Sequence, residues 1–301
     1  MFDRLTLASD LVDCRGGVLA PRGFVVSPEA IADAALAAPR RPRRALRETF
    51  AREDLGYPLG HAACQPLLRG EGVRPAVEHA LLGMELPDAV WDELSALRAS
   101  AVRIYRHGLV AATTAVRMLL AAVGPARGIS DLAAAALVHD LGMRHVPAAV
   151  LRARDRLTRE EATQVAAHPL LGAFHLARLL GSHPAVPAAR SHHWRCGQGY
   201  PRLSAPPSRS IEVVGVASAF AALVEPRPFR SGAFDARGAT DVLVAEAAVG
   251  HADPTTVRLL VHALRGGRGD LRGILLGHAR EGHGPQTNRH VPLVPPERSP
   301  V

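Results

Sequence analysis

The sequence has no lysine, so all 36 of its basic residues are arginine. Set against 28 acidic residues, they give a formal net charge of +8. The complete exclusion of one basic residue type indicates biased codon usage rather than selection for a phosphate-binding face. The densest basic run, Arg40, Arg41, Arg43 and Arg44, is interrupted by Pro42 and is more typical of a solvated linker. We therefore expect no nucleic-acid polymer as a partner.

Cysteine and long apolar runs are also scarce. The three cysteines, Cys14, Cys64 and Cys196, are far apart and odd in number, which argues against a disulfide framework and for a reducing compartment. No apolar run reaches the roughly 18 residues that a membrane-spanning helix needs. The N-terminus has no basic segment followed by an apolar stretch. These absences predict a cytoplasmic protein with no membrane partner.

Aromatic residues make up only 4% of the chain, whereas 48% of its residues are hydrophobic. An apolar set rich in Ala and Leu favours closely packed helices over a β-sandwich, whose strands favour aromatic and β-branched residues. With 301 residues the chain can form one large domain or two small ones around a sizeable core. We predict a mainly α protein.

Turn signals and apolar spacing divide the chain into four parts. Residues 1–38 alternate short apolar runs with Gly and Pro turns, which predicts a small strand-rich N-terminal segment. Residues 39–87 show only weak helical periodicity and are interpreted as a linker and irregular region. Residues 88–265 have helical spacing throughout. Residues 266–301 open on a Gly-rich breaker and are expected to form an extended or hairpin C-terminal tail.

Start signals support the helices of residues 88–265. A capping-box sequence occupies residues 158–161, and Pro254 suits a first helical position. Trp91, Leu94 and Leu97 are three positions apart and predict one buried helix face. The predicted helices lie near residues 89–123, 130–142, 158–167, 170–180, 184–193, 211–224, 235–249 and 253–264.

Histidine carries the functional signal, because eight of the 15 histidines fall within residues 107–193. His139 and Asp140 end an apolar run and place a nitrogen and an oxygen donor at the edge of a core, where an unpaired carboxylate is costly to bury. A metal ion would compensate that cost, and a simple His–Asp hydrogen bond is the alternative. Further candidates stand on other predicted helices or helix ends, where each could also be a core, capping or surface residue. They are His107, His168, His192 and His193.

Several short motifs occur in a fixed order along this part of the chain. They are HDLG at residues 139–142, LTREE at 157–161, HPLLG at 168–172, HH at 192–193, GYP at 199–201 and RPFR at 227–230. This order resembles the HD superfamily of metal-dependent phosphohydrolases, and within it the HD-GYP group, which hydrolyses cyclic di-GMP. The resemblance covers about residues 100–265 and implies an HD-type helical bundle.

The resemblance also implies a metal site and a set of substrate contacts. One or two divalent transition-metal ions, Fe, Mn, Zn, Co or Ni, would activate water for in-line attack on a phosphodiester. Arg227, Arg230 and Tyr200 would contact the substrate, although an Arg after a helix end is often only a solvated cation. The first ion would be held by His107, His139 and Asp140, and Asp140 would bridge to a second ion held by His168, His192 and His193.

Some positions depart from the family pattern, and they affect the metal ligands and the catalytic residues. Ser218 and Ala221 stand where the family usually has aspartates, so a carboxylate ligand is missing. Met143 occupies the lysine position of the family's HDxGK motif. We consider Asp140 and Arg144 the catalytic candidates, with Arg144 able to replace the lost cation only by reaching round the helix end.

The loop after the histidine pair is one residue shorter than the family's HHExxDGxGYP element and lacks its Glu and Asp. Aligning the loop on its GYP end would pair Ser191 and His192, rather than His192 and His193, with the two ligand positions. We align on the histidine pair, because ligands are harder to lose than loop spacing. Cys196 is either an extra soft ligand or an ordinary loop thiol.

Three functional hypotheses follow. The first is a metal-dependent HD-GYP-like phosphodiesterase that hydrolyses cyclic di-GMP in bacterial signalling. The second is a catalytically degenerate binding or scaffold protein that signals through protein partners. The third is an HD hydrolase of another phosphoester. A homodimer is considered as well.

Overall fold

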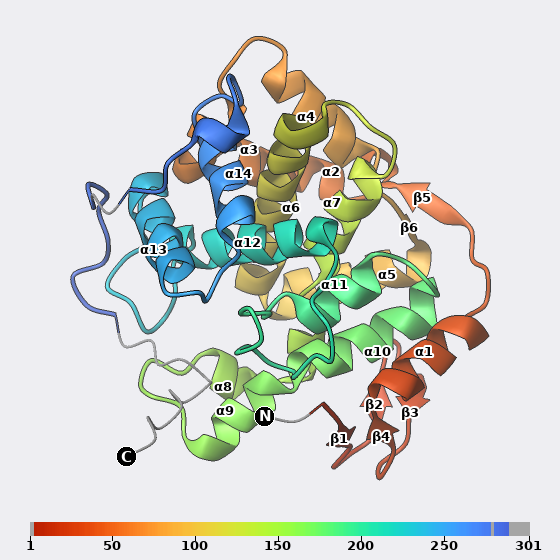
Figure 1. Ribbon diagram of the computed structural model, residues 1–301. Helices are drawn as coiled ribbons and strands as arrows, with labels where there is room; N and C mark the ends of the chain where they lie inside the picture. Colours follow the sequence, from red (N-terminus) through yellow and green to blue (C-terminus); the bar gives the residue numbers. More distant parts are fainter. Residues whose placement is uncertain (1–2, 278–279, 289–301) are drawn as a thin grey trace.

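The computed structural model describes residues 3–277 and 280–288. At its centre lies α6 (Val102–Val123), whose residues 107–119 are all buried (Figure 1). A helix that is buried on every side must be surrounded by other elements. Its main neighbours are α7 (Ile129–Val138), α12 (Arg209–Val224), α5 (Asp88–Ser100) and α14 (Pro254–Leu264).

A second group of helices packs beside this centre. In it α10 (His168–Leu180) lies against α11 (Ala185–Ser191) and against α1 (Pro28–Ala37). The other helices of residues 88–265 are α8 (Ala148–Leu151), α9 (Arg159–Ala166) and α13 (Ala236–Ala248). A 3₁₀ turn, η3 (Leu141–His145), connects α7 to α8. The prediction of a mainly α protein is confirmed.

The N-terminal segment contains the predicted short strands, which Figure 1 shows at one end of the molecule together with α1. Two antiparallel pairs form, β1 with β4 and β2 with β3. The segment packs on the helical part through Phe24, whose ring centroid lies 5.3 Å from that of Phe174 on α10. The strands are β1 (Leu5–Thr6), β2 (Leu11–Val12), β3 (Val18–Ala20) and β4 (Val25–Val26).

The helix ends follow many of the sequence signals, but two predicted blocks are divided and the short helix α8 was not predicted. The block expected near 130–142 forms α7, which ends at Val138, and the separate turn η3. The block expected near 89–123 forms two helices, α5 and α6, because Ala101 has a non-helical backbone (φ −145°, ψ 59°). The capping box at the start of α9 is formed by Thr158 and Glu161, as predicted. Pro254 opens α14, with Asp253 as its N-cap.

Residues 39–87 differ from the expected linker and irregular region. Their apolar residues, such as Leu46, Leu67 and Leu81, are fully buried in the common core. Apart from α4, whose first turn contains Pro75 and which follows Gly70 and Gly72, the elements are too short for a helical period to be visible in the sequence. They are β5 (Arg43–Ala45), paired with β6 (Glu85–Pro87), the helices α2 (Ala51–Asp54), α3 (Gly56–Gly60) and α4 (Val73–Leu82), and the 3₁₀ turns η1 (Leu46–Glu48) and η2 (Ala62–Leu68).

The tail is extended where the structure describes it. It has a short 3₁₀ turn, η4 (Leu271–Gly273), and a β-bridge joins Asn288 to Arg230. Residues 280–284 lie along α13, where Asp241 accepts backbone hydrogen bonds from Glu281 and Gly282. The apolar run at residues 291–294 lies outside the described residues.

Two glycines allow backbones to meet where helices cross. A side chain at Gly108 of α6 would collide with the carbonyl oxygen of Leu137 on α7. A side chain at Gly142 of η3 would collide with the carbonyl oxygen of His168 at the start of α10. Both contacts bring segments that carry candidate ligands to backbone contact distance.

Burial of the predicted face of α5 gives a direct test of the core. Trp91, Leu94 and Leu97 are 1–3% exposed, which confirms that face. Replacing Leu94 by Ala leaves a cavity and should lower the free energy of unfolding by about 2–5 kcal/mol. Thermal or urea denaturation measures the loss. The exposed neighbour Ser95→Ala is the control, and equal stability of the two variants would show that this face is not a core.

Candidate metal centre

Two groups of candidate ligands share one carboxylate, that of Asp140. Within each group the donor atoms all lie within 4.8 Å of one another. Every member is buried except His193, which is partly buried. The first group is His107, His139 and Asp140, and the second is Asp140, His168, His192 and His193.

The ligands converge because each stands near the end of a helix. Backbone carbonyl oxygens then fix the orientation of three of the rings. The Nδ1 atoms of His139, His168 and His192 lie 2.7, 2.6 and 2.8 Å from the carbonyl oxygen three residues earlier in each case. A carbonyl oxygen can only accept, so Nδ1 donates and carries the proton in all three neutral rings. Each Nε2 therefore keeps a free lone pair.

These free lone pairs point at the shared carboxylate. The Nε2 atoms of His168 and His192 are 3.0 Å apart, and each lies 3.2 Å from Oδ1 of Asp140. That buried oxygen has no hydrogen-bond partner of good geometry among the described residues. Two unprotonated nitrogens and an oxygen this close have no proton to share, so a cation between them would compensate all three. The residues present fit a metal ion.

Burial keeps the ligands in the state that binds metal. It lowers the pKa of His139 to about 4, and that of His193 well below its usual value. Neutral imidazoles and an ionised carboxylate are the forms that coordinate a divalent cation.

His107 is oriented differently from the other rings. Its Nδ1 lies 3.4 Å from a guanidinium nitrogen of Arg227, which can only donate, so the proton of the neutral ring belongs on Nε2. Nε2 faces Ser218 Oγ and His139 Nε2, each at 3.3 Å. Metal binding at Nε2 would move that proton to Nδ1, against the guanidinium. Burial and the charge of Arg227 also hold the pKa of His107 well below its usual value.

The two ligand groups are therefore unequal. The first group has a ring with unfavourable proton placement and the neutral hydroxyl of Ser218 where the family usually has an aspartate. Ala221 is fully buried on the same helix and adds no donor. We expect the group containing His168 and His192 to bind metal more tightly.

The remaining predicted site residues take varied positions. The ring of Tyr200 stacks on His193, with centroids 4.4 Å apart at an interplanar angle of 19°. Arg230 donates to the carbonyl oxygens of Ala222 and Leu223 at the end of α12. Arg227 contacts His107, as described above.

Other residues lie outside the ligand groups. Arg144 binds Glu93 at 2.6 Å instead of facing the ligands. Ser191 is hydrogen-bonded to the carbonyl oxygen of Pro187, so the histidine pair, rather than the Ser-His pair, reaches the centre. Cys196 is exposed in the loop and belongs to neither group.

A second polar cluster, which does not include the ligands, was not predicted from the sequence. Glu93, His145 and His175 form it together with Arg144. Its one signal is that Glu93 falls among the apolar residues of the predicted face of α5.

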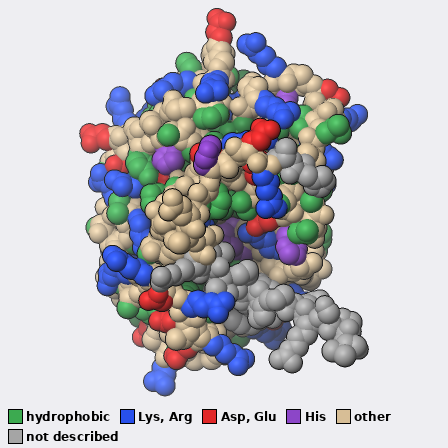
Figure 2. Space-filling view, turned by 90° about the vertical axis from the view of Figure 1, so that its left-hand side faces the viewer, with side chains coloured by type: hydrophobic (Ala, Val, Ile, Leu, Met, Phe, Trp, Pro, Cys, Tyr) green, Lys and Arg blue, Asp and Glu red, His purple; other side chains and the backbone are tan. Residues whose placement is uncertain are grey.

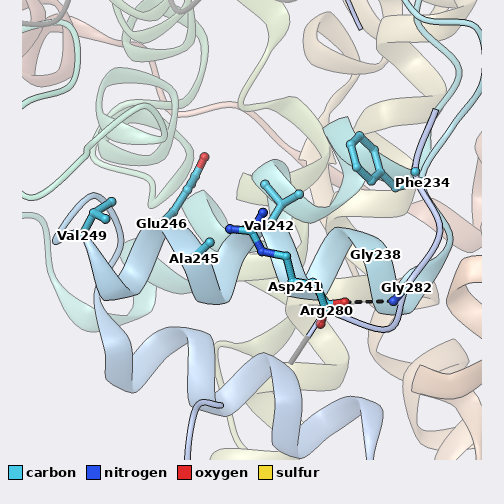
Figure 3. A pocket seen from close by; sticks show the side chains of 10 residues that line it. Phe234, Gly238, Asp241, Val242, Ala245, Glu246, Val249, Arg280 and Gly282 are labelled. Atoms are coloured by element: carbon cyan, nitrogen blue, oxygen red, sulfur yellow. Dashed lines mark hydrogen bonds between the residues drawn. The ribbon is translucent and has the colours of Figure 1, made fainter. Parts of the chain in front are cut away.

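A separate pocket of about 440 Å³ lies between α13 and residues 280–284 (Figure 3). None of the ligands lines it. Glu246 at its edge forms an ion pair with Arg195, which tethers the loop after His193 to α13. Asp241 is bound to the backbone of Gly282, as the dashed line in Figure 3 shows.

Arginine side chains are spread over the face drawn in Figure 2 and mixed with acidic ones, without a continuous basic stripe. The same view shows a hollow in which histidine side chains are visible. Within the described part of the chain, no helix combines the length and apolarity needed to cross a bilayer.

The chain belongs to the HD domain family, which matches residues 88–256. It is also similar to the 3'3'-cGAMP-specific phosphodiesterase 1 of Vibrio cholerae serotype O1. The two are 27% identical over 128 residues, which are 42% of this chain but only 30% of that relative.

Two solved structures give weaker likenesses. One is the HD domain of the Listeria phosphodiesterase PgpH (L. monocytogenes) in complex with cyclic-di-AMP, at 17% identity and TM-score 0.45, covering 58% of this chain and 93% of that one. The other is the HDG"Y"P protein Bd1817 of Bdellovibrio bacteriovorus, at 18% identity and TM-score 0.46, covering 79% and 77%.

We predict that the protein purifies with a transition metal at about one or two ions per chain, because the converging lone pairs require a cation. Asp140→Ala should remove most of it, because Asp140 belongs to both ligand groups, and His139→Ala should remove only the ion of the first group. Exposed His251→Ala should remove none. Elemental analysis after purification without chelators measures the content. The prediction fails if no metal is found and added Mn, Fe or Zn leaves the melting temperature unchanged.

Ser218→Asp should strengthen the first ligand group. The new carboxylate would place a charged oxygen donor beside His107 and tighten metal binding about ten-fold or more. In chelator the unpaired buried charge should lower stability. Calorimetric titration of both proteins decides the question, with Ser210→Asp near the start of the same helix as the control. Equal affinities would mean that residue 218 does not reach the metal.

Proposed function

We propose that the chain is a metal-dependent phosphodiesterase of HD-GYP type that hydrolyses a cyclic dinucleotide, with cyclic di-GMP as the first candidate. The observation that carries this proposal is the carboxylate of Asp140, which is shared by two ligand groups and faced by the Nε2 lone pairs of His139, His168 and His192. Two adjacent metal positions suit in-line hydrolysis of a phosphodiester, because both the attacking and the leaving oxygen need stabilisation.

Bound divalent ions would supply an activated water nucleophile and neutralise phosphate charge. The side chains would hold these ions and the substrate. Asp140 would supply a ligand to both ions, because it belongs to both ligand groups. Arg227 presents a half-buried guanidinium beside His107, where it can bind a non-bridging phosphate oxygen. Tyr200 covers His193 and limits water access on that side.

The other arginine candidates are less well placed in this state. Arg230 is engaged by carbonyl oxygens of α12, and Arg144 by Glu93. A substrate role for Arg230 requires it to leave those carbonyls. We therefore assign the main phosphate contact to Arg227.

The choice of a cyclic dinucleotide rests on the HD-GYP-like motifs and on the named activity of the Vibrio relative. The aligned segment covers only part of that relative, and the altered loop 194–198 is the part that would distinguish bases. Cyclic di-GMP, 3'3'-cGAMP and cyclic di-AMP are therefore all assayed.

A catalytically degenerate binding protein is the second candidate, and specific observations favour it. Ser218 offers no charge, Met143 supplies no cation, and the proton of His107 opposes metal binding. Such a protein would keep nucleotide or metal affinity without turnover and would act through a protein partner.

The test is product analysis with each of the three dinucleotides in the presence of Mn or Fe. We expect conversion to a linear dinucleotide, lost in Asp140→Asn and reduced mainly through a higher KM in Arg227→Gln. Ser218→Asp combined with Met143→Lys should raise a weak turnover. Binding without turnover, even in that double variant, would establish the degenerate protein instead, and turnover of a different phosphoester alone would exclude a cyclic dinucleotide.

A further inference from the structure

Glu93 on α5 is a buried carboxylate, only 1% exposed, with partners from three separate parts of the chain. Its Oε2 accepts a hydrogen bond from Arg144 at 2.6 Å. Its Oε1 accepts one from the backbone N–H of Cys14 at 2.6 Å. The same oxygen lies 3.3 Å from Nε2 of His175, a close contact without the geometry of a hydrogen bond. A buried carboxylate is stabilised only by such close donors. Burial alone would raise the pKa of Glu93, but these partners lower it below its usual value.

Arg144 connects Glu93 to the shared ligand Asp140. Asp140 is the N-cap of η3, and Arg144 lies near the end of this short turn. Its hydrogen bonds are Met143 N–H to the carbonyl oxygen of Asp140 at 2.9 Å and Val146 N–H to that of Met143 at 3.1 Å. Holding Arg144 therefore holds the far end of the turn that begins at the shared ligand.

His175 connects Glu93 to the second ligand group. It lies on α10, two turns after His168, which is the first residue of that helix. Its Nδ1 is 3.2 Å from Nε2 of His145 at the end of η3. Glu93 thus contacts both segments that meet at Gly142 and carry Asp140 and His168.

We infer that Glu93 is a positioning residue for the metal centre: through Arg144 and His175 it holds η3 and α10 in the arrangement that directs Asp140 and His168 at one point. It acts through these residues and contacts neither ligand. The inference deepens the proposed function, because any effect on turnover rests on that function.

The same carboxylate ties the N-terminal segment to the centre. Cys14 lies in the turn between β2 and β3, and the neighbouring residue Arg15 forms an ion pair with Asp92 on α5 at 2.5 Å. The turn between β2 and β3 therefore supplies one of the hydrogen bonds to Glu93, through the backbone N–H of Cys14. The N-terminal strands become part of the support of the metal site.

The test compares Glu93→Gln, Arg144→Gln and the double variant with Leu94→Ala, which removes core packing on the same helix without touching the cluster. Metal affinity is measured by titration, and amide hydrogen exchange at Met143 and Val146 is measured in metal-free protein. We expect Glu93→Gln to weaken metal binding about ten- to a hundred-fold, the range found when a residue that supports a ligand is lost. Exchange at the two amides should rise.

The control separates positioning from general stability. Leu94→Ala should lower the melting temperature while metal affinity stays within about two-fold, because its loss is one of core packing. In the double variant the two effects should not add, since both substitutions break the same contact.

Unchanged exchange at Met143 and Val146 in folded Glu93→Gln overturns the inference, as does unchanged metal affinity in that variant. A wild-type protein that binds no metal would instead contradict the proposed function, and the exchange measurement would still decide the role of Glu93.

Discussion

The buried negative charge of Asp140 is the constraint on which the rest of the structure depends. A carboxylate in a core destabilises the fold unless it is matched by donors or by a cation. Here its neighbours are imidazoles whose protons are drawn away by backbone carbonyl groups, so they offer lone pairs instead of hydrogen bonds. The end of α7, the start of α10 and the end of α11 all lie close to Asp140. The arrangement is understandable as a fold completed by cations.

The charge balance also differs across the centre. On one side, imidazoles with fixed Nδ1 protons surround the carboxylate. On the other side stand the neutral hydroxyl of Ser218 and the positive guanidinium of Arg227, so this side has less of the negative charge that would stabilise a bound cation. This asymmetry links the absent aspartates to a physical property, the relative affinity of two neighbouring metal positions, and explains how a chain of this family could retain one ion while holding the other weakly.

Much of the helical part was predictable because local signals determine it. Periodicity located α9 to α14, and the capping box fixed the start of α9. The ligands were predictable because their motifs occur in order. Residues 39–87 were not, since most of their elements are too short to show a period and Gly and Pro interrupt the sequence around α4. The partner of Arg144 was not, because Glu93 lies 51 positions away and nothing local indicates the contact. The proton position on His107 depends on Arg227, which is 120 positions distant.

The backbone contacts at Gly108 and Gly142 limit the size of the site formed by the candidate ligands. Where side chains separate two helices, rotamer changes and repacking let the spacing vary; where backbones touch, there is nothing left to compress. The closest approach of the segments that carry His107 and His139, and of those that carry Asp140 and His168, is thus limited by main-chain atoms. Such a site is preorganised and needs little rearrangement to accept an ion. The slow step of metal exchange would then be the opening of a path past Tyr200 and the loop tethered by Arg195, so the rate of exchange would depend on this loop and not on reshaping of the ligands.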